Sequence, residues 1–262
     1  MLVFIIPVKS ARVSSDWKFF SKLVDRTVKS VLNQTDKDFK IIMVCHEVPA
    51  IENLDKIDVI PVDIALPQLI DGDVNHNNAQ KENDKTSKIK VGFEHAKQYN
   101  PDFVMVVDSD DCISSKIAGF ANASKDHSPG WFVSKGYNYK EGSKIIFKKN
   151  RTFNFMCGTC VIIKPDYFMD MIIPDPWVHY AHEKTTMNDG KELKALPFPA
   201  AIYSIANGEN HFMSSGATVD MMKKYFFNVK RYLKLFDKLT KYRVKPVSRR
   251  LRSEFGLWPI TS

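Results

Sequence analysis

Short apolar runs alternate with amphipathic segments along the first part of the chain, and this order restricts the folds that the sequence can adopt. Each run spans only a few residues between polar boundaries, as buried strands do. The segments after the first and third runs instead repeat apolar residues at helical spacing. The order strand, helix, strand, strand, helix, strand predicts an α/β fold with a mostly parallel sheet flanked by helices. The predicted strands are residues 3–8, 39–45, 57–62 and 103–107.

Polar residues mark where the two predicted helices begin. Ser15 is the expected cap of the first helix, and Thr86 or Ser87 that of the second. Residues 71–85 have no hydrophobic periodicity, so we expect a mobile loop there. The second half is less regular, and its expected elements are a hairpin around Glu141 and Gly142, a strand at 158–164, a helix from Pro165 and a last strand at 198–205.

The positive charge of the protein is concentrated near its C-terminus. The whole chain carries a net charge of +8, whereas the segment from Val219 to Arg252 alone contains twelve Lys and Arg against two Asp. Met, aromatic and aliphatic residues recur among these cations. We therefore expect residues 218–262 to form a basic amphipathic helical tail, which either packs on the rest of the protein or attaches to an anionic membrane surface.

The cysteine content and the N-terminal residues bear on the cellular compartment. Four cysteines in 262 residues do not describe a disulfide scaffold, so we expect a reducing environment. The first apolar run follows no basic segment and ends at Pro7, which favours a strand over a signal peptide. No run approaches the roughly 18 apolar residues of a membrane-spanning helix. We expect a cytoplasmic protein that is at most peripheral on the inner face of the membrane.

Two of the cysteines have the spacing of a redox motif. Redox proteins place such a motif at the start of a helix, but Cys157 and Cys160 are followed by the β-branched residues Val161, Ile162 and Ile163. We expect two small buried residues at the start of a strand and no redox pair.

The fourth strand ends in three carboxylates, Asp108, Asp110 and Asp111. A solvated turn is one interpretation. A calcium loop is excluded because its template needs Gly and Glu where this chain has Ile113 and Gly119. The third interpretation is a Mg²⁺ or Mn²⁺ site shared with a substrate diphosphate. A cation would remove the repulsion between the carboxylates, which is about 4 kcal/mol per pair at ~4 Å and an effective dielectric of 20.

Four ordered elements resemble the nucleotide-diphospho-sugar transferase (GT-A) fold, especially the family 2-like glycosyltransferases. They are FIIPVK before a helix, SVLNQTDKDFKIIMVCHE, the Gly-x-x-x-Ala of KVGFEHAK, and VVDSDD. The pattern matches residues 1–115 well and 130–215 loosely. The resemblance implies a Rossmann-like domain over residues 1–217, with a nucleotide-binding half at 1–115 and an acceptor half at 116–217.

The resemblance also implies roles for residues in the first half. The first Asp of the motif, Asp108, would contact the ribose or the metal, and Asp110 would hold the metal. Asp111 stays open between a third ligand and a helix cap. The donor nucleotide would further contact Pro7, Val8 and Lys9 after the first strand, Glu47 after the second, and Lys85 and Lys88 near the diphosphate.

The second half would supply the remaining chemistry. An inverting transferase needs a carboxylate general base for the acceptor hydroxyl, and the candidates are Asp175, Glu183, Asp189 and Glu192. Glu183 is the expected base, because it lies about where the family carries Glu-Asp. His211 is a further candidate ligand of the metal.

The function implied by the resemblance is a metal-dependent glycosyltransferase of the EC 2.4 type. It would move a sugar from a nucleoside-diphosphate sugar to a glycan or lipid-linked hydroxyl acceptor, in surface polysaccharide or glycolipid synthesis, with Mn²⁺ or Mg²⁺ as cofactor. No nucleic-acid-reading module accompanies the basic tail. Two alternatives stay open: a catalytically silent nucleotide-sugar-binding module, and a sugar nucleotidyltransferase. The latter needs a Gly-rich phosphate loop, and PVKSARVSSDWK contains no glycine.

Overall fold

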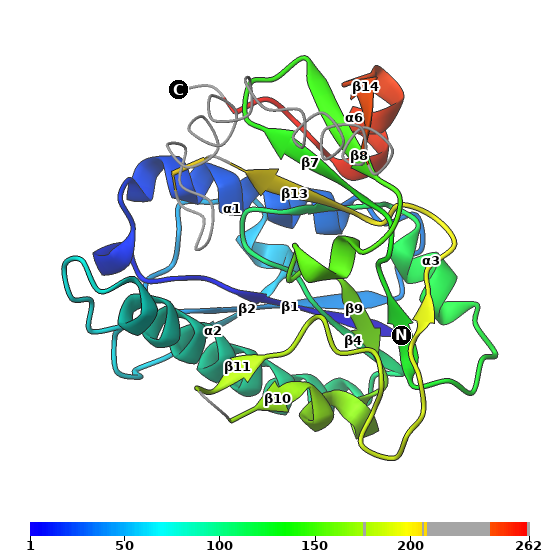
Figure 1. Ribbon diagram of the computed structural model, residues 1–262, viewed down its shortest axis with the longest axis horizontal. Helices are drawn as coiled ribbons and strands as arrows, with labels where there is room; N and C mark the ends of the chain where they lie inside the picture. The colour runs from blue at the N-terminus through cyan, green and yellow to red at the C-terminus, as the bar shows by residue number, and fades with distance from the viewer. Residues whose placement is uncertain (175–176, 206, 209–241, 261–262) are drawn as a thin grey trace, which may run out of the picture.

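A mostly parallel sheet of seven strands forms the centre of the protein, as the sequence predicts (Figure 1). The computed structural model describes residues 1–174, 177–205, 207–208 and 242–260. The strand order is β12-β6-β9-β4-β1-β2-β3, and only β9 runs antiparallel to its neighbours. The strands are β1 (Leu2–Pro7), β2 (Phe39–Cys45), β3 (Asp58–Pro61), β4 (Phe103–Val106), β6 (Gly130–Phe132), β9 (Val161–Ile163) and β12 (Lys194–Ala195).

A second sheet of five strands lies beside helix α1 (Trp17–Leu32). Its order is β14-β8-β7-β13-β5, which joins segments from both halves of the chain. A two-stranded ribbon of β10 (Ile172–Ile173) and β11 (His179–Tyr180) lies near helix α2 (Val74–Ala96). The strands of the second sheet are β5 (Cys112–Ile113), β7 (Gly136–Lys140), β8 (Ile145–Lys149), β13 (Ala201–Ile205) and β14 (Tyr242–Pro246).

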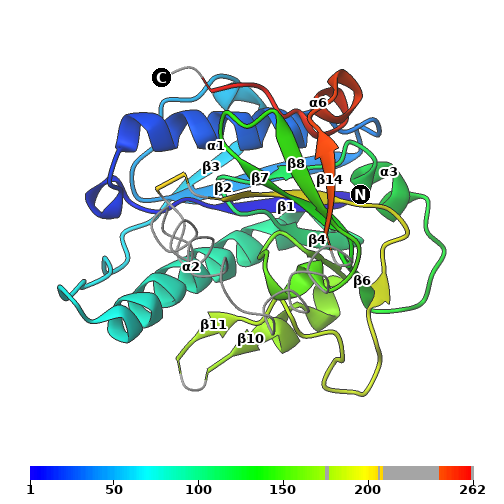
Figure 2. The same ribbon diagram turned by 45° about the horizontal axis from the view of Figure 1, so that its top comes forward.

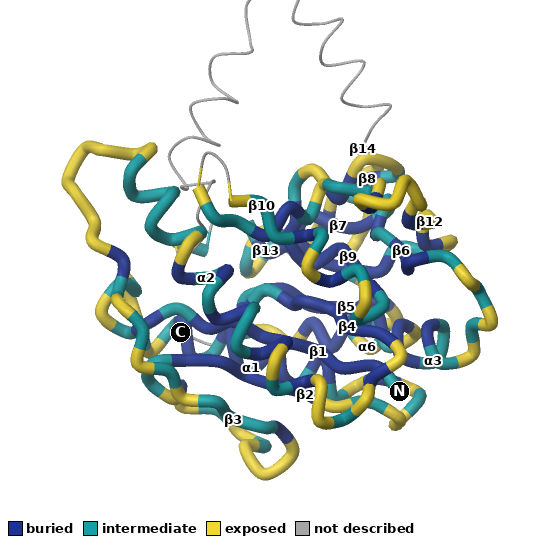
Figure 3. Tube along the Cα trace, turned by 90° about the horizontal axis from the view of Figure 1, so that it is seen from below, coloured by how far each residue is buried: buried dark blue, intermediate teal, exposed yellow. Residues whose placement is uncertain are grey.

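Helices cover both faces of the central sheet, with α1 on one side and α2 on the other (Figure 2). Strands β1 and β4 are buried along their whole length, as uninterrupted apolar strands between two helical layers should be (Figure 3). The shorter helices are α3 (Ile117–Asn122), α6 (Arg249–Phe255) and the 3₁₀ segments η1 (Ala11–Val13), η2 (Leu54–Lys56), η3 (Lys97–Tyr99), η4 (Phe153–Phe155) and η5 (Pro165–Met171). In the described part of the chain, no helix is both long and apolar enough to cross a membrane.

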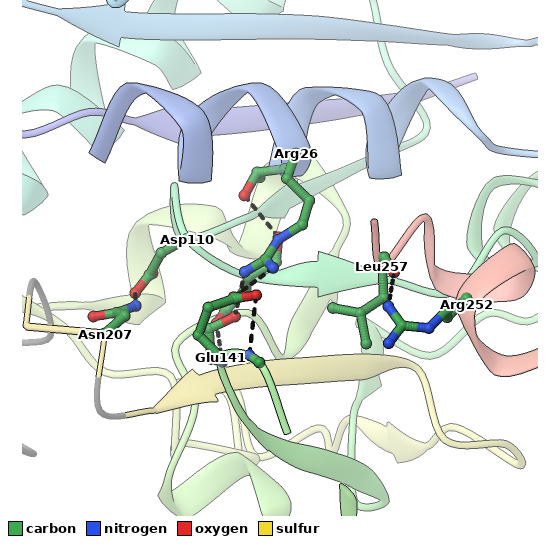
Figure 4. A network of polar contacts seen from close by, with 10 residues as sticks. Arg26, Asp110, Glu141, Asn207, Arg252 and Leu257 are labelled. Atoms are coloured by element: carbon green, nitrogen blue, oxygen red, sulfur yellow. Dashed lines mark hydrogen bonds and ion pairs between the residues drawn. The ribbon is translucent and has the colours of Figure 1, made fainter. Parts of the chain in front are cut away.

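Helix α1 carries polar side chains on a buried face, because it lies between the two sheets. Arg26, which is 3% exposed, donates to Glu141 Oε2 at 2.6 Å and to Ser204 Oγ at 3.3 Å (Figure 4). The Thr27 hydroxyl donates to the backbone carbonyl of Asp111 at 2.8 Å, and the Ser30 hydroxyl accepts from the Ile113 amide at 2.8 Å. These bonds satisfy groups that would be costly to bury alone. They also fix the second sheet relative to the first.

Both predicted helix starts are wrong, and the reasons differ. Helix α1 is capped by Asp16, whose side chain accepts from the Phe19 amide at 2.9 Å, so the expected cap Ser15 is displaced by one residue. Helix α2 spans Val74–Ala96 and is capped by Asp73, so most of the segment expected to be a mobile loop is helical. The first half of α2 extends past the core. Its side chains therefore show no apolar stripe for a periodicity argument to detect.

The described part of the basic tail packs on the domain. Residues 242–246 form β14, a strand where a helix was expected, and it pairs antiparallel with β8. In α6 the side chains of Leu251 and Phe255 are buried. The boundary expected at residues 217 and 218 lies outside the described residues, as do residues 219–241.

Helix α2 approaches the central sheet closely at one glycine. A Cβ atom on Gly92 would lie 2.5 Å from Ile5 Cγ2 and 3.1 Å from Val44 Cγ2. Ile5 is a fully buried, β-branched residue in the central strand, so it has little freedom to move away. The glycine therefore sets the distance between α2 and the sheet.

We expect Gly92→Ala to lower the free energy of unfolding by about 1–3 kcal/mol, because overpacking outweighs the better helix propensity of alanine. Urea unfolding followed by circular dichroism measures the change. Gly119→Ala in α3 is the matched control, since the nearest atom to its added Cβ is 3.5 Å away. That variant should be stabilised by about 0.4–1 kcal/mol. Equal stabilisation of both variants would contradict the close approach.

Candidate functional site

A cavity of about 280 Å³ lies beyond the carboxyl ends of β1 and β4. In sheets of parallel strands this edge is the usual place for a ligand, because the loops that leave the strands meet there. The cavity is lined by the turn after β1, by α2, by the acidic end of β4 and by segments of the second half of the chain. The main lining residues are Pro7, Val8, Lys9, Lys81, Glu82, Asp84, Lys85, Lys88, Asp108, Ser109, Asp110, Met156, Gly158, His182 and Tyr203.

An ion pair joins α2 to the end of β4 inside this cavity. Lys85 Nζ lies 2.6 Å from Asp108 Oδ1, and each side chain is less than a fifth exposed. Burial would lower the pKa of Lys85, but the attraction of Asp108 and Glu82 raises it above its usual value. Lys85 therefore presents a permanent positive charge beside the acidic strand end.

A second pair, Lys88 and Asp84, lies deeper on the same helix. Lys88 is fully buried, and its Nζ donates to Asp84 Oδ2 at 2.6 Å. Burial lowers the pKa of Lys88 in spite of the attraction of Asp84. Among the described residues, Asp84 Oδ1 is buried and has no hydrogen-bond partner. Both residues line the cavity, and Asp84 Oδ1 could accept a further hydrogen bond there.

The carboxylate of Asp110 is held by the segment after β13. Asn207 Nδ2 donates to Asp110 Oδ2 at 2.8 Å (Figure 4). Burial raises the pKa of Asp110, and the nearby charge of Asp108 raises it further. A positive charge placed beside Asp110 would therefore be stabilising.

Asp111 is neither a cavity ligand nor a helix cap. It is fully buried, and its carboxylate accepts from Thr159 Oγ1 at 2.7 Å, from the Ser204 amide at 3.1 Å and from Cys157 Sγ at 3.2 Å. Burial and the neighbouring carboxylates raise its pKa well above the usual value. This finding settles the alternative that the sequence left open: Asp111 connects the acidic turn with β13 and with the segment before β9.

The Cys-Gly-Thr-Cys segment shapes the floor of the cavity. The hydroxyl of Thr159 accepts from the Asp108 amide at 2.9 Å while it donates to Asp111. A Cβ on Gly158 would lie 2.5 Å from Asp108 Oδ2 and 2.9 Å from Lys85 Nζ, so only glycine leaves room for that ion pair. Burial raises the pKa of Cys157 and of Cys160 well above that of a free thiol. The thiols are therefore small packing groups.

The described cavity residues fit a hard divalent cation that a substrate also ligates. Within the described ranges, no group of three or more His, Cys, Asp and Glu side chains is arranged to hold a metal ion. Asp108 and Asp110 both line the cavity, and Mg²⁺ commonly binds through one or two carboxylates together with phosphate oxygens and water. The raised pKa of Asp110 shows that a positive charge there would be favourable. The donor set thus fits a cation shared with a diphosphate.

Most of the predicted donor-site residues meet at this cavity. They are Pro7, Val8, Lys9, Lys85, Lys88, Asp108 and Asp110. Glu47 does not line it: its carboxylate accepts from Ser10 Oγ at 3.0 Å and from the Ala11 amide at 2.9 Å, and so supports the turn after β1. The side chain of Glu183 is 46% exposed and is also not among the lining residues. His211 lies outside the described residues.

The sequence reasoning missed several lining residues. Lys81, Glu82 and Asp84 belong to the segment that was expected to be a loop. For Asp84 the sequence did contain a signal: Asp84 and Lys88 have i, i+4 spacing, which places both side chains on one face of a helix. His182 and Tyr203 reach the cavity from segments that are distant in sequence, and no local pattern identifies them.

Two solved structures are similar to this chain in fold. Residues 1–349 of TarS from S. aureus align with 79% of this chain at 11% identity and a TM-score of 0.42, and this chain spans 61% of that one. A protein from Desulfovibrio desulfuricans G20 that carries the name of a nucleotide-diphospho-sugar transferase aligns with 78% of this chain and 80% of its own, at 12% identity and a TM-score of 0.36. No family model and no curated protein matches the sequence.

We expect none of the four cysteines to react with Ellman's reagent in the folded protein at pH 8. All four thiols are buried, and raised pKa values, about 11 for Cys45 and Cys112, keep them protonated there, whereas the thiolate is the nucleophile. Unfolding in guanidinium should expose all four. Rapid labelling of Cys157 or Cys160 in the folded protein would contradict a packing role and favour a redox one.

Proposed function

We propose that the protein is a glycosyltransferase that takes its sugar from a nucleoside-diphosphate donor. The observation that carries this proposal is the cavity itself, where Lys85 and Asp108 form an ion pair beside Asp110 at the carboxyl ends of β1 and β4. Cations and carboxylates in one cavity suit a diphosphate that is bound together with a divalent metal. The four ordered motifs of the GT-A type support the same assignment.

The lysines have the simplest role in this proposal. Lys9, Lys85 and Lys88 line the cavity from the turn after β1 and from α2, and they would attract the negative charge of the diphosphate. When the sugar leaves, charge develops on the diphosphate oxygen. Fixed positive charges in a site with little water stabilise that charge most strongly.

Asp108 and Asp110 would hold Mn²⁺ or Mg²⁺ against the same diphosphate. The metal, when bound, acts as a Lewis acid that stabilises the leaving nucleoside diphosphate. Asn207 and the Thr159 hydroxyl hold the two Asp residues in place, through the Asp110 side chain and the Asp108 amide. The acceptor is a hydroxyl of a glycan or of a lipid-linked glycan, in the synthesis of a surface polysaccharide or glycolipid. The proposed location is the cytoplasm.

A panel of UDP-, GDP-, dTDP-, ADP- and CDP-sugars, each with and without Mn²⁺, tests this function through nucleotide release and calorimetric binding. Lys85→Gln should weaken donor binding by about tenfold to a hundredfold, because it removes a charge-assisted contact to phosphate. Asp110→Asn should remove the dependence of turnover on Mn²⁺.

The matched control is Lys97→Gln, because Lys97 is exposed, pairs with Glu94 and lies outside the cavity. The proposal fails if no donor binds, or if the Lys85 and Asp110 variants bind the donor as tightly as the control. Binding without any turnover would favour the alternative of a catalytically silent module. Formation of a nucleotide sugar from a sugar phosphate and a nucleoside triphosphate would favour the nucleotidyltransferase.

We also propose that residues 219–252 bring the protein to an anionic membrane surface. In the described part, Arg243 lies directly opposite Lys148 on neighbouring strands, a like-charge pair that costs stability. Lys245 and Lys135 are also near, and the pKa of Lys148 is lowered by burial and by these three cations. None of the four cations forms an ion pair with another described residue. Phe147 and Val244, 38% and 55% exposed, alternate with them along the strands.

Flotation with phosphatidylcholine vesicles, with and without phosphatidylglycerol, tests the membrane role. The double variant Arg243→Gln, Lys245→Gln should lose about 2 kcal/mol of binding to the anionic vesicles, or about thirtyfold, at roughly 1 kcal/mol per basic residue. The control is Lys191→Gln, Lys194→Gln, because these exposed lysines are already paired with Asp189 and Asp126. Equal flotation of both double variants would argue against a membrane role for this strand pair.

A further inference from the structure

The described lining of the cavity includes one imidazole, and the donor roles leave it unused. The same described lining includes four carboxylates that could also accept a proton. Asp108 is paired with Lys85, Asp84 with Lys88, and Asp110 accepts from Asn207. Glu82 lies on α2 near Lys85, on the phosphate side of the cavity. The remaining group is His182, which lines the cavity from the second half of the chain, as Met156 and Gly158 do.

The ring of His182 is held in one tautomer. Its Nδ1 lies 2.7 Å from the backbone oxygen of Asn154. A carbonyl oxygen only accepts hydrogen bonds, so Nδ1 carries the hydrogen and the neutral ring has its lone pair on Nε2. No described residue makes a hydrogen bond to Nε2. An imidazole with a fixed Nδ1 hydrogen and an unused Nε2 in a cavity has the arrangement of a general base.

The backbone around His182 is fixed as well. Its amide donates to the Tyr180 oxygen at 2.8 Å, and its own carbonyl accepts from Cys160 Sγ at 3.2 Å. Asn154 Nδ2 also donates to the carbonyl oxygen of Glu183 at 3.4 Å. These contacts hold the ring at the cavity wall and leave the Glu183 carboxylate 46% exposed, outside the lining.

We propose that His182, and not Glu183, is the general base that takes the proton from the acceptor hydroxyl; this inference rests on the transferase function proposed above. Nε2 removes the hydroxyl proton as the acceptor oxygen forms its bond to the anomeric carbon. The bond from that carbon to the diphosphate oxygen breaks, and its electron pair leaves with the nucleoside diphosphate. Water takes the place of the acceptor when the donor is hydrolysed.

Charged and titratable groups surround the ring of His182 on two sides. Glu183 Oε2 lies 3.9 Å from Nδ1, and the Cys160 thiol packs beside the ring. Lys85 and Asp108 line the same cavity from α2 and from the end of β4. The base therefore works beside a carboxylate of its own segment and opposite a lysine and aspartate pair.

The test uses the donor that turns over in the panel, with water as the acceptor and nucleotide release as the signal. His182→Gln should lower kcat by about 10²–10⁴-fold, the usual contribution of a general base. Calorimetric affinity for the nucleoside diphosphate should stay within about threefold, since the ring acts on the acceptor and not on the donor. Added imidazole should restore part of the activity of His182→Ala.

The pH profile of kcat separates the two candidate bases. With an imidazole base the rate of the wild type falls at a higher pH than with a carboxylate base, because an imidazole holds its proton more tightly than a carboxylate does. His179→Gln is the matched control, because its Nδ1 also lies against a backbone oxygen, that of Trp177, but its side chain is outside the cavity. Thermal unfolding of each variant shows whether it is folded.

Each outcome decides the proposal. A folded His182→Gln variant that keeps its kcat overturns it, as does a loss of activity that occurs in Glu183→Gln instead. Loss of nucleotide affinity in His182→Gln would make the residue part of the donor site and would also overturn it. If the wild type neither binds nor turns over any donor, the proposed function itself fails, and the proposal that His182 is the general base fails as well.

Discussion

The buried carboxylate of Asp111 joins three segments that are distant in the sequence. It accepts hydrogen bonds from Thr159 and Cys157 before β9 and from the Ser204 amide in β13, while Thr27 of α1 donates to its backbone oxygen. A buried carboxylate is costly unless it is satisfied in this way. Because Asp108 and Asp110 belong to the same turn, the network that satisfies Asp111 also fixes where the two cavity carboxylates lie.

Buried hydrogen bonds also hold the second sheet against helix α1. Helix α1 lies between the two sheets. Its side chains Arg26, Thr27 and Ser30 form hydrogen bonds with residues in or next to the second sheet, namely Glu141, Asp111 and Ile113. Ser30 also donates to the Phe255 oxygen at 2.7 Å, and Gly256 lies against Ser30 so closely that a Cβ would come within 2.8 Å of its Cα. The C-terminal residues therefore complete the packing of the domain that bears the cavity.

Sequence reasoning correctly predicted the elements whose apolar pattern is visible within one short segment of the chain. Strands β1, β2 and β4 are continuous apolar runs, and Asp108 and Asp110 were located because they directly follow one of these runs. It failed where a helix leaves the core, because the first half of α2 serves the cavity and has no apolar stripe. Glu47 as a donor contact stays a prediction: its carboxylate supports the β1 turn and is not among the residues that line the cavity.

The residues that line the cavity from the second half of the chain could not be predicted for a different reason. His182 follows the ribbon of β10 and β11, which contacts α2, and Tyr203 belongs to β13, which pairs with β5 just after the acidic turn. Such proximity is a property of the tertiary structure. The local sequence alone does not favour His182 over its neighbour Glu183 as a cavity residue. Only the geometry distinguishes a ring at the cavity wall from a carboxylate that is half exposed.

The central claim is that one cavity at the ends of β1 and β4 binds a nucleoside diphosphate. A crystal structure of the protein grown with UDP or GDP and Mn²⁺ tests it most directly. The account predicts that the diphosphate lies between Lys85 and Asp110, and that Asp110 would help to hold the metal. A nucleotide bound at another face of the protein, or a diphosphate that contacts neither residue, would contradict it.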